Sequence, residues 1–277
     1  MGLSAFGFSL MAVFVKLANA SGIPVLEIVI ARALISLILS YAAVKRKGIS
    51  VWGHKKCLLI ARGAVGALAL CCVYYSLTRL PLAEATLIQY LHPMFTGLLA
   101  FVFLQEILQR ETIVCIFLSL IGIVLIAQPT DLFGASTMSD DLGAIGAAVA
   151  GAFGSAVTYV LVRKLNETED ASVIIFYFPL IALPIAIMLS GGNLVLPVGI
   201  QWGYLLLVGV FTQMGQIGLT KAMQSEGAGK AVAYSYLQVV FAVFFGWLFF
   251  SEVPGFWTCL GGGLIVMGAL INLMWRC

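Results

Sequence analysis

The chain has 277 residues, of which 62% are hydrophobic and only 10% are charged, and its formal net charge is +3. Its mean hydropathy is +1.08. Ordinary soluble domains carry about 25% charged residues, so this composition excludes a water-soluble globule. Apolar runs near the ~20 residues that a helix needs to cross a bilayer predict an all-α polytopic membrane protein.

Ten apolar runs are expected to cross the membrane. The first, at residues 2–20, has no basic leader and no small-residue cleavage pattern, so we interpret it as a retained helix rather than a signal peptide. The others follow at residues 25–44, 57–77, 82–104, 111–128, 142–164, 171–190, 201–222, 228–250 and 255–275.

Two of these runs carry nearly the same sequence. Residues 87–106 match residues 233–252 at an offset of 146 without a gap, so that Tyr90 aligns with Tyr236. A repeat with an odd number of spans inserts its second copy upside down. We therefore predict two inverted five-helix repeats, residues 1–128 and 142–277, joined by a non-cytoplasmic linker at 129–141. Secondary transporters with inverted repeats alternate access by rocking one repeat against the other.

The basic residues gather at one predicted membrane face, which by the positive-inside rule is cytoplasmic. The opposite face keeps only Arg79. Both termini are then cytoplasmic, in a protein that we expect in the bacterial inner membrane. The basic stretch between the second and third spans is too short to fold around nucleic acid, so we expect no nucleic-acid partner. The residues at the basic face are Lys45, Arg46, Lys47, Lys55, Lys56, Arg110, Arg163, Lys164, Lys221, Lys230 and Arg276.

Several stretches resemble the drug/metabolite transporter superfamily, EamA type. In the first half these are Arg62-Gly63, residues 74–77, residues 81–85, Pro93 and Glu106. In the second half they are "VLVRKL" at 160–165 and "FFSEVPGFWTCLGGGLIVMGA" at 249–269. The Lys and Arg that this family commonly has in its first two spans resemble Lys16 and Arg32. The resemblance covers essentially the whole chain and implies transport, but the family contains exporters, importers and nucleotide-sugar carriers.

Polar side chains inside the spans are candidates for solute contact, because each is costly when it faces lipid. Gln89, His92 and Thr96 follow at steps of three and four and so share one helix face. Ser235 and Gln238 occupy the positions equivalent to Gln89 and His92, so the two stripes could meet in one cavity. Each residue could equally be interhelical hydrogen bonding. Further candidates from other spans are Tyr75, Tyr159, Gln213 and Gln216.

Arg32 is the deepest fixed positive charge, about 10 Å inside the second span at 1.5 Å per residue. Its guanidinium suits a carboxylate, which favours an anionic group on the solute. A structural ion-pair network with Glu27 or Lys16 is the alternative. Lys16 is also a candidate for solute contact or gating, although it could snorkel to the interface, as we expect of Arg62 on the cytoplasmic side.

His92 could couple transport to protons or be a neutral hydrogen-bonding residue. Pro93, in the middle of its span, is a candidate hinge, because proline removes a helical hydrogen bond. Val239 replaces it in the second repeat, so the two halves need not bend alike. Glu106 and Glu252 end equivalent spans, and we expect both to be structural, each stabilising the N-terminus of the next helix.

We therefore expect a secondary transporter that moves a small polar metabolite, amino-acid-like or carboxylate-bearing, with S-adenosylmethionine-like solutes included. Proton or exchange coupling fits, since no phosphate-cradling glycine loop is present. The alternatives are a broad exporter of amphipathic drugs, which the aromatic residues support, and a non-transporting membrane organiser. Enzyme motifs, channel filters and metal-ligand spacings are absent from the sequence, so we expect no catalysis, metal or cofactor. Small residues in the last span suit a homodimer or intramolecular packing equally.

Overall fold

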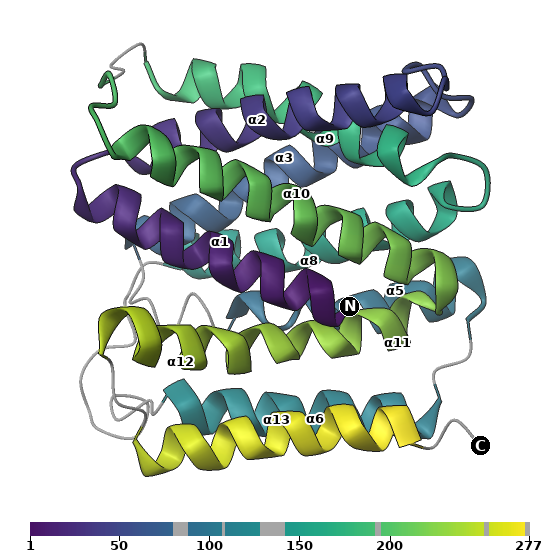
Figure 1. Cartoon of the computed structure of the whole chain (residues 1–277). Coiled ribbons are helices and arrows are strands. Elements are labelled where there is room, and N and C mark those ends of the chain that lie inside the picture. The colour runs from purple at the N-terminus through teal and green to yellow at the C-terminus, as the bar shows by residue number, and fades with distance from the viewer. Residues whose placement is uncertain (80–87, 107–108, 128–141, 192–194, 252–254, 275–277) are drawn as a thin grey trace.

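The computed structural model describes residues 1–79, 88–106, 109–127, 142–191, 195–251 and 255–274, and over these it is helical with no strand (Figure 1). The helices of the first half are α1 (Gly2–Ala20), α2 (Val25–Arg46), α3 (Lys56–Arg79), α5 (His92–Leu104) and α6 (Arg110–Ala127). Those of the second half are α8 (Leu142–Leu165), α9 (Ala171–Leu189), α10 (Gln201–Ser225), α11 (Ala228–Ala233), the 3₁₀ turn η1 (Tyr234–Tyr236), α12 (Leu237–Phe250) and α13 (Phe256–Met274).

The predicted all-α fold of ten spans is confirmed, with α11, η1 and α12 together forming the ninth. By length and composition, six of the described helical stretches could each cross a membrane unaided. The predicted linker at residues 129–141 and the first part of the predicted fourth span lie outside the described residues.

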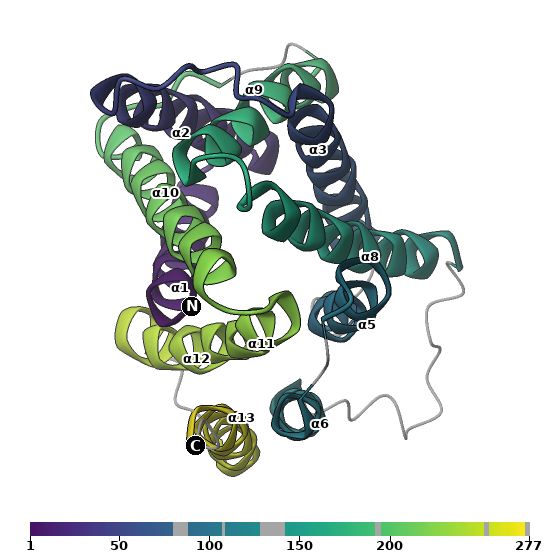
Figure 2. The same ribbon diagram turned by 90° about the vertical axis from the view of Figure 1, so that its right-hand side faces the viewer.

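The most extensive contacts between helices are preserved when the two halves are exchanged. α3 packs on α8 as α10 packs on α1, and α3 packs on α9 as α10 packs on α2. The pairs α2–α9 and α6–α13 join counterparts directly, and α6 and α13 lie together at one side of the remaining helices (Figure 2). A pseudo-two-fold relation between two repeats requires this pattern of contacts.

Equivalent helix ends in the two halves are separated by the 146-residue offset of the repeat. Gln105 and Ser251 end α5 and α12 in the left-handed conformation, with φ of 56° and 55°. The fourth and ninth spans are both interrupted at equivalent places, by a turn at Tyr90 and Leu91 and by η1. Pro93 therefore lies in the first turn of α5 rather than at a kink inside a continuous helix, where its missing N–H costs nothing.

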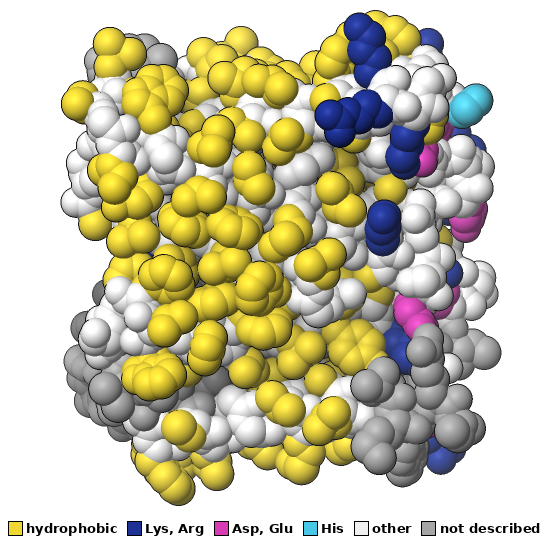
Figure 3. Space-filling view, in the orientation of Figure 1, with side chains coloured by type: hydrophobic (Ala, Val, Ile, Leu, Met, Phe, Trp, Pro, Cys, Tyr) yellow, Lys and Arg dark blue, Asp and Glu magenta, His cyan; other side chains and the backbone are white. Residues whose placement is uncertain are grey.

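Charged side chains gather at one end of the molecule on the face shown in Figure 3. The start of α1 and the last turns of α13 lie at this same end in Figure 1. Here the loop after α2 is tied to the second half, because Lys47 pairs with Asp170 at 2.8 Å and the N–H of His54 donates to Glu169 at 2.5 Å. Burial alone would raise the pKa of Asp170, but the hydrogen bonds from Lys47 and Ser172 lower that pKa below its usual value.

Candidate solute cavity between the two halves

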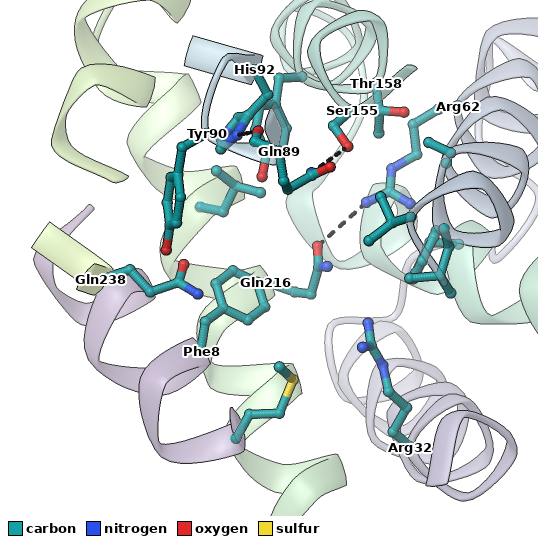
Figure 4. A pocket seen from close by; sticks show the side chains of 18 residues that line it. Phe8, Arg32, Arg62, Gln89, Tyr90, His92, Ser155, Thr158, Gln216 and Gln238 are labelled. Carbon is teal, nitrogen blue, oxygen red and sulfur yellow. Dashed lines mark hydrogen bonds between the residues drawn. The ribbon is translucent and has the colours of Figure 1, made fainter. Parts of the chain in front are cut away.

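A cavity of about 380 Å³ lies between the halves and is lined by residues of both repeats (Figure 4). Its aromatic lining comes from Phe8, Tyr90, Tyr159 and Phe178. No aspartate or glutamate is among the described residues that line it. Its polar lining residues are Arg32, Arg62, Gln89, His92, Ser155, Thr158, Gln216 and Gln238.

Arg62 is buried against this cavity, with only 2% of its surface exposed. One guanidinium nitrogen, Nη2, donates to Gln216 Oε1 at 3.3 Å, and the guanidinium carbon lies 4.6 Å from the centre of the Phe178 ring. The Nε and Nη1 groups have no partner among the described residues. The expectation that Arg62 snorkels to the interface is therefore wrong, because its side chain extends into the protein rather than toward the membrane surface.

Arg32 enters the same cavity from α2, and its guanidinium points toward Gln216 in Figure 4. Over the residues that the structure describes, Arg32 has no hydrogen bond or ion pair. Glu27 instead accepts a hydrogen bond from the main chain of Val195, and the amine of Lys16 lies 4.2 Å above the ring of Phe250. The structural network that the sequence offered for Arg32 is thus not formed.

Gln89 and His92 face the cavity from the interrupted fourth span. The amide nitrogen of Gln89 donates to Ser155 Oγ at 3.3 Å, and Nδ1 of His92 lies 2.9 Å from the main-chain oxygen of Gln89. The edge of the His92 ring meets the Tyr159 ring at 5.4 Å between centroids. The buried atoms Gln89 Oε1 and His92 Nε2 are left without partners in the described part of the chain.

Tyr90 and Tyr236, which the repeat aligns, meet each other across the pseudo-two-fold axis. The Tyr236 hydroxyl donates to the main-chain oxygen of Tyr90 at 3.1 Å, and the ring centroids are 6.1 Å apart. Beside them, Gln238 lines the cavity from α12, while its main-chain oxygen accepts from Ser9 at 2.9 Å. The two interrupted spans therefore converge on this cavity through Gln89, His92 and Gln238, whereas Thr96 and Ser235 of the same polar stripes do not line it.

Five predicted site residues lie elsewhere. Thr96 donates to the main-chain oxygen of His92 at 2.8 Å, and Gln213 bonds the hydroxyls of α2 instead of facing the cavity. Ser235 is not among the lining residues, and its Oγ is buried without a partner in the described residues. Tyr75 and Lys16 are exposed outside the cavity.

Of the two carboxylates that we expected to be structural, the structure describes only Glu106. Glu106 pairs with Arg163 at 2.8 Å and accepts from the Ala228 N–H at 2.6 Å. It thus holds the N-terminus of α11, which belongs to the second half of the chain. Glu252 lies outside the described residues.

Sequence reasoning missed Arg62 as a cavity residue, together with Phe8 and Phe178. A signal for Arg62 was available, because it lies about as far inside its own helix as Arg32, roughly 9 Å at 1.5 Å per residue. No group of His, Cys, Asp or Glu that could hold a metal ion occurs among the residues that the structure describes.

Two helical halves with matching contacts and a polar cavity between them are the architecture of many secondary transporters. The chain belongs to the EamA-like transporter family, whose sequence model matches residues 1–128 and 142–274. It is thereby a member of the drug/metabolite transporter superfamily, as its motifs predict.

Its relatives include named transporters. The pseudopaline exporter CntI of Pseudomonas aeruginosa is 33% identical over 97% of this chain and 92% of its own length. Human solute carrier family 35 member G1 is 31% identical over 98% of this chain and 76% of its own length. A solved crystal structure at 19% identity covers 99% of this chain and 96% of its own with a TM-score of 0.84, which shows the fold alone. These named relatives are transporters rather than enzymes.

Proposed function

We propose that this protein is a secondary transporter that carries a small carboxylate-bearing metabolite through the cavity by alternating access. The observation that supports the proposal is the pair of arginines, Arg32 and Arg62, lining a cavity without a described carboxylate. An uncompensated buried charge costs several kcal/mol. An anionic solute would offset that cost, and guanidinium groups bind carboxylates through two parallel hydrogen bonds.

Export into the outside medium is the direction that we propose, because the pseudopaline exporter CntI matches this chain over nearly its whole length. The orientation that we propose places both termini and the charged end of Figure 3 in the cytoplasm of a bacterial cell. In this proposal, transport is coupled to protons or to the exchange of one solute molecule for another across the membrane. The two parts that move against each other are the inverted repeats, residues 1–128 and 142–277.

Export of amphipathic cations is the second candidate, and the aromatic lining of the cavity favours it. A solute with a net positive charge would be repelled by Arg32 and Arg62, and no carboxylate among the described lining residues offsets that repulsion. S-adenosylmethionine-like solutes, which have a permanent positive charge, are disfavoured on the same ground. Carboxylates with a net negative charge therefore suit the described lining best.

Counterflow in proteoliposomes tests the proposal. Proteoliposomes that contain the purified protein are loaded in turn with unlabelled amino acids, dicarboxylates, adenosylated metabolites and lipophilic cations. The uptake of each labelled compound in exchange for the enclosed one is then measured. We expect exchange of carboxylates, lowered at least tenfold by Arg32→Gln. Lys16→Gln, which removes a cation outside the cavity, is the control and should leave exchange within about twofold. Exchange confined to lipophilic cations, insensitive to Arg32→Gln, would support the second candidate instead.

A further inference from the structure

Hydrogen bonds on the wall of the cavity that carries Gln89 and His92 determine what that wall can bind. Ser155 Oγ donates its only proton to the Gly151 main-chain oxygen at 2.9 Å. It can therefore only accept from Gln89, which fixes the amide nitrogen of Gln89 toward Ser155. The other amide atom, Oε1, is an acceptor with no described partner.

His92 is oriented by the same reasoning. Its Nδ1 lies 2.9 Å from a main-chain carbonyl oxygen, which can only accept, so Nδ1 carries the proton. In the neutral imidazole, Nε2 is then an acceptor, and it too is buried without a described partner. The contact with Tyr159 holds the ring in this orientation.

The cavity thus has two walls of opposite hydrogen-bonding character. Figure 4 shows Arg32 and Arg62 on one side and Gln89, Tyr90 and His92 on another. The arginines can only donate, whereas Gln89 Oε1 and His92 Nε2 can only accept. Buried acceptors that lack a donor are costly, so a solute with an N–H group would satisfy them.

We propose that Gln89 and His92 form a subsite for an amino or imino group on the same molecule as the carboxylate bound by Arg32 and Arg62. The inference rests on the proposed function and narrows its substrate class from carboxylates to amino or imino acids. Gln89 and His92 are then specificity-determining residues, and Ser155 is a positioning residue that acts through Gln89.

Three small probes test the subsite. Glutarate has two carboxylates and no nitrogen, iminodiacetate replaces its central methylene by a nitrogen that is protonated at neutral pH, and glutamate adds a protonated amino group. Dissociation constants are measured calorimetrically on the purified full chain in detergent. We expect iminodiacetate or glutamate to bind about 10- to 100-fold more tightly than glutarate, which is the range for one hydrogen bond to a charged group.

Variants assign the difference to the subsite. Gln89→Leu and His92→Phe should each reduce the preference for the nitrogen-bearing probes to about threefold or less and leave glutarate binding nearly unchanged. Ser155→Ala, which frees the Gln89 amide to rotate, should have a smaller effect in the same direction. Gln224→Leu, an exposed amide near the end of α10, is the matched control and should change nothing. Thermal unfolding without ligand checks that each variant is folded.

The outcomes separate this inference from the proposed function. Equal binding of the three probes by the unmodified protein would overturn the subsite and leave the carboxylate transporter standing. The same holds if Gln89→Leu and His92→Phe, when folded, weaken all three probes equally. Failure of every probe to bind the folded protein would contradict the proposed function, and the subsite with it.

Discussion

Arg62 is expected to lower the stability of the folded protein while it favours binding of the solute. A guanidinium with 2% exposure and two nitrogens without described partners gains little from its surroundings beyond the Phe178 ring and one bond to Gln216. Replacement of such a buried charge by an apolar side chain is often neutral or stabilising. If Arg62 were a structural residue instead, its replacement by an apolar side chain should lower the stability of the protein.

The first prediction follows from this contrast. Arg62→Met should leave the thermal unfolding midpoint unchanged or raise it, because it removes a desolvated charge. It should also weaken carboxylate binding at least tenfold, about 1.4 kcal/mol. Thermal unfolding and calorimetric titration of the same preparation measure both effects. A large drop in the midpoint with unchanged binding would assign Arg62 a structural role.

Gln213 shows the reverse pattern, and the second prediction concerns it. Its amide accepts from Ser36 at 2.6 Å and donates to Ser40 at 2.9 Å, joining α10 to α2. Gln213→Leu should destabilise the protein by about 1–2 kcal/mol, because interhelical hydrogen bonds in membranes contribute about 0.6 kcal/mol each and the serines lose their partner. Carboxylate affinity should stay within twofold. Loss of affinity without loss of stability would contradict this assignment.

Helical spacing predicted part of the site but could not separate these roles. Gln213 and Gln216 are one turn apart on α10, yet one faces α2 and the other the cavity. Periodicity identifies a polar face, whereas the packing partner of each residue on that face depends on tertiary contacts. Arg62 was misplaced for a related reason, since a long side chain near a helix end can extend outward or inward.

At the scale of elements, the repeat predicted more than single residues did. The ninth span is interrupted at η1 without a proline, because Val239 stands at the position equivalent to Pro93. The shared break therefore follows from the packing of both spans around the axis, where Tyr90 meets Tyr236, rather than from proline itself. A local rule for proline could not have predicted it.

The third prediction uses the contact between α6 and α13. A Cβ atom on Gly122 would lie 2.5 Å from the Gly261 main-chain oxygen, whereas one on Gly268 would lie 3.2 Å from that of Cys115. Gly122→Ala should therefore destabilise the protein by about 1–3 kcal/mol through overpacking. Gly268→Ala should be nearly neutral, because its gain in helix propensity offsets a milder clash.

Gly262 supplies the control for this series. It lies on α13, as Gly268 does, but a Cβ atom on Gly262 would meet no other atom within 4 Å. Gly262→Ala should stabilise the protein by a few tenths to about 1 kcal/mol. Equilibrium unfolding of the three variants in detergent gives the order. Equal effects at all three positions would show that α6 and α13 do not pack closely.

At the scale of the whole molecule, composition and the offset of 146 residues predicted the architecture, because the most extensive helix pairs, such as α3 with α8 and α10 with α1, match when the two halves are exchanged. The ties between the halves were not predictable. Glu106, which follows α5 in the first half, pairs with Arg163 of α8 and accepts from the start of α11, both in the second half. Neither repeat contains this contact alone.

Orientation is the fourth prediction. Cys57 is exposed beside Lys56 at the charged end of the molecule. If that end is cytoplasmic, a membrane-impermeant thiol reagent should label a variant that keeps only Cys57 in inside-out vesicles and not in right-side-out vesicles. Labelling of right-side-out vesicles alone would reverse the proposed topology.

Alternating access requires the cavity between the halves to open in turn to the two sides of the membrane. Thr158→Cys in a background without the six native cysteines places one thiol in the cavity lining. An anionic methanethiosulfonate reagent is added to one side of oriented vesicles at a time, with and without a transported carboxylate. We predict labelling from either side and protection by the carboxylate in both cases. Labelling from one side only under every condition would contradict alternating access through this cavity.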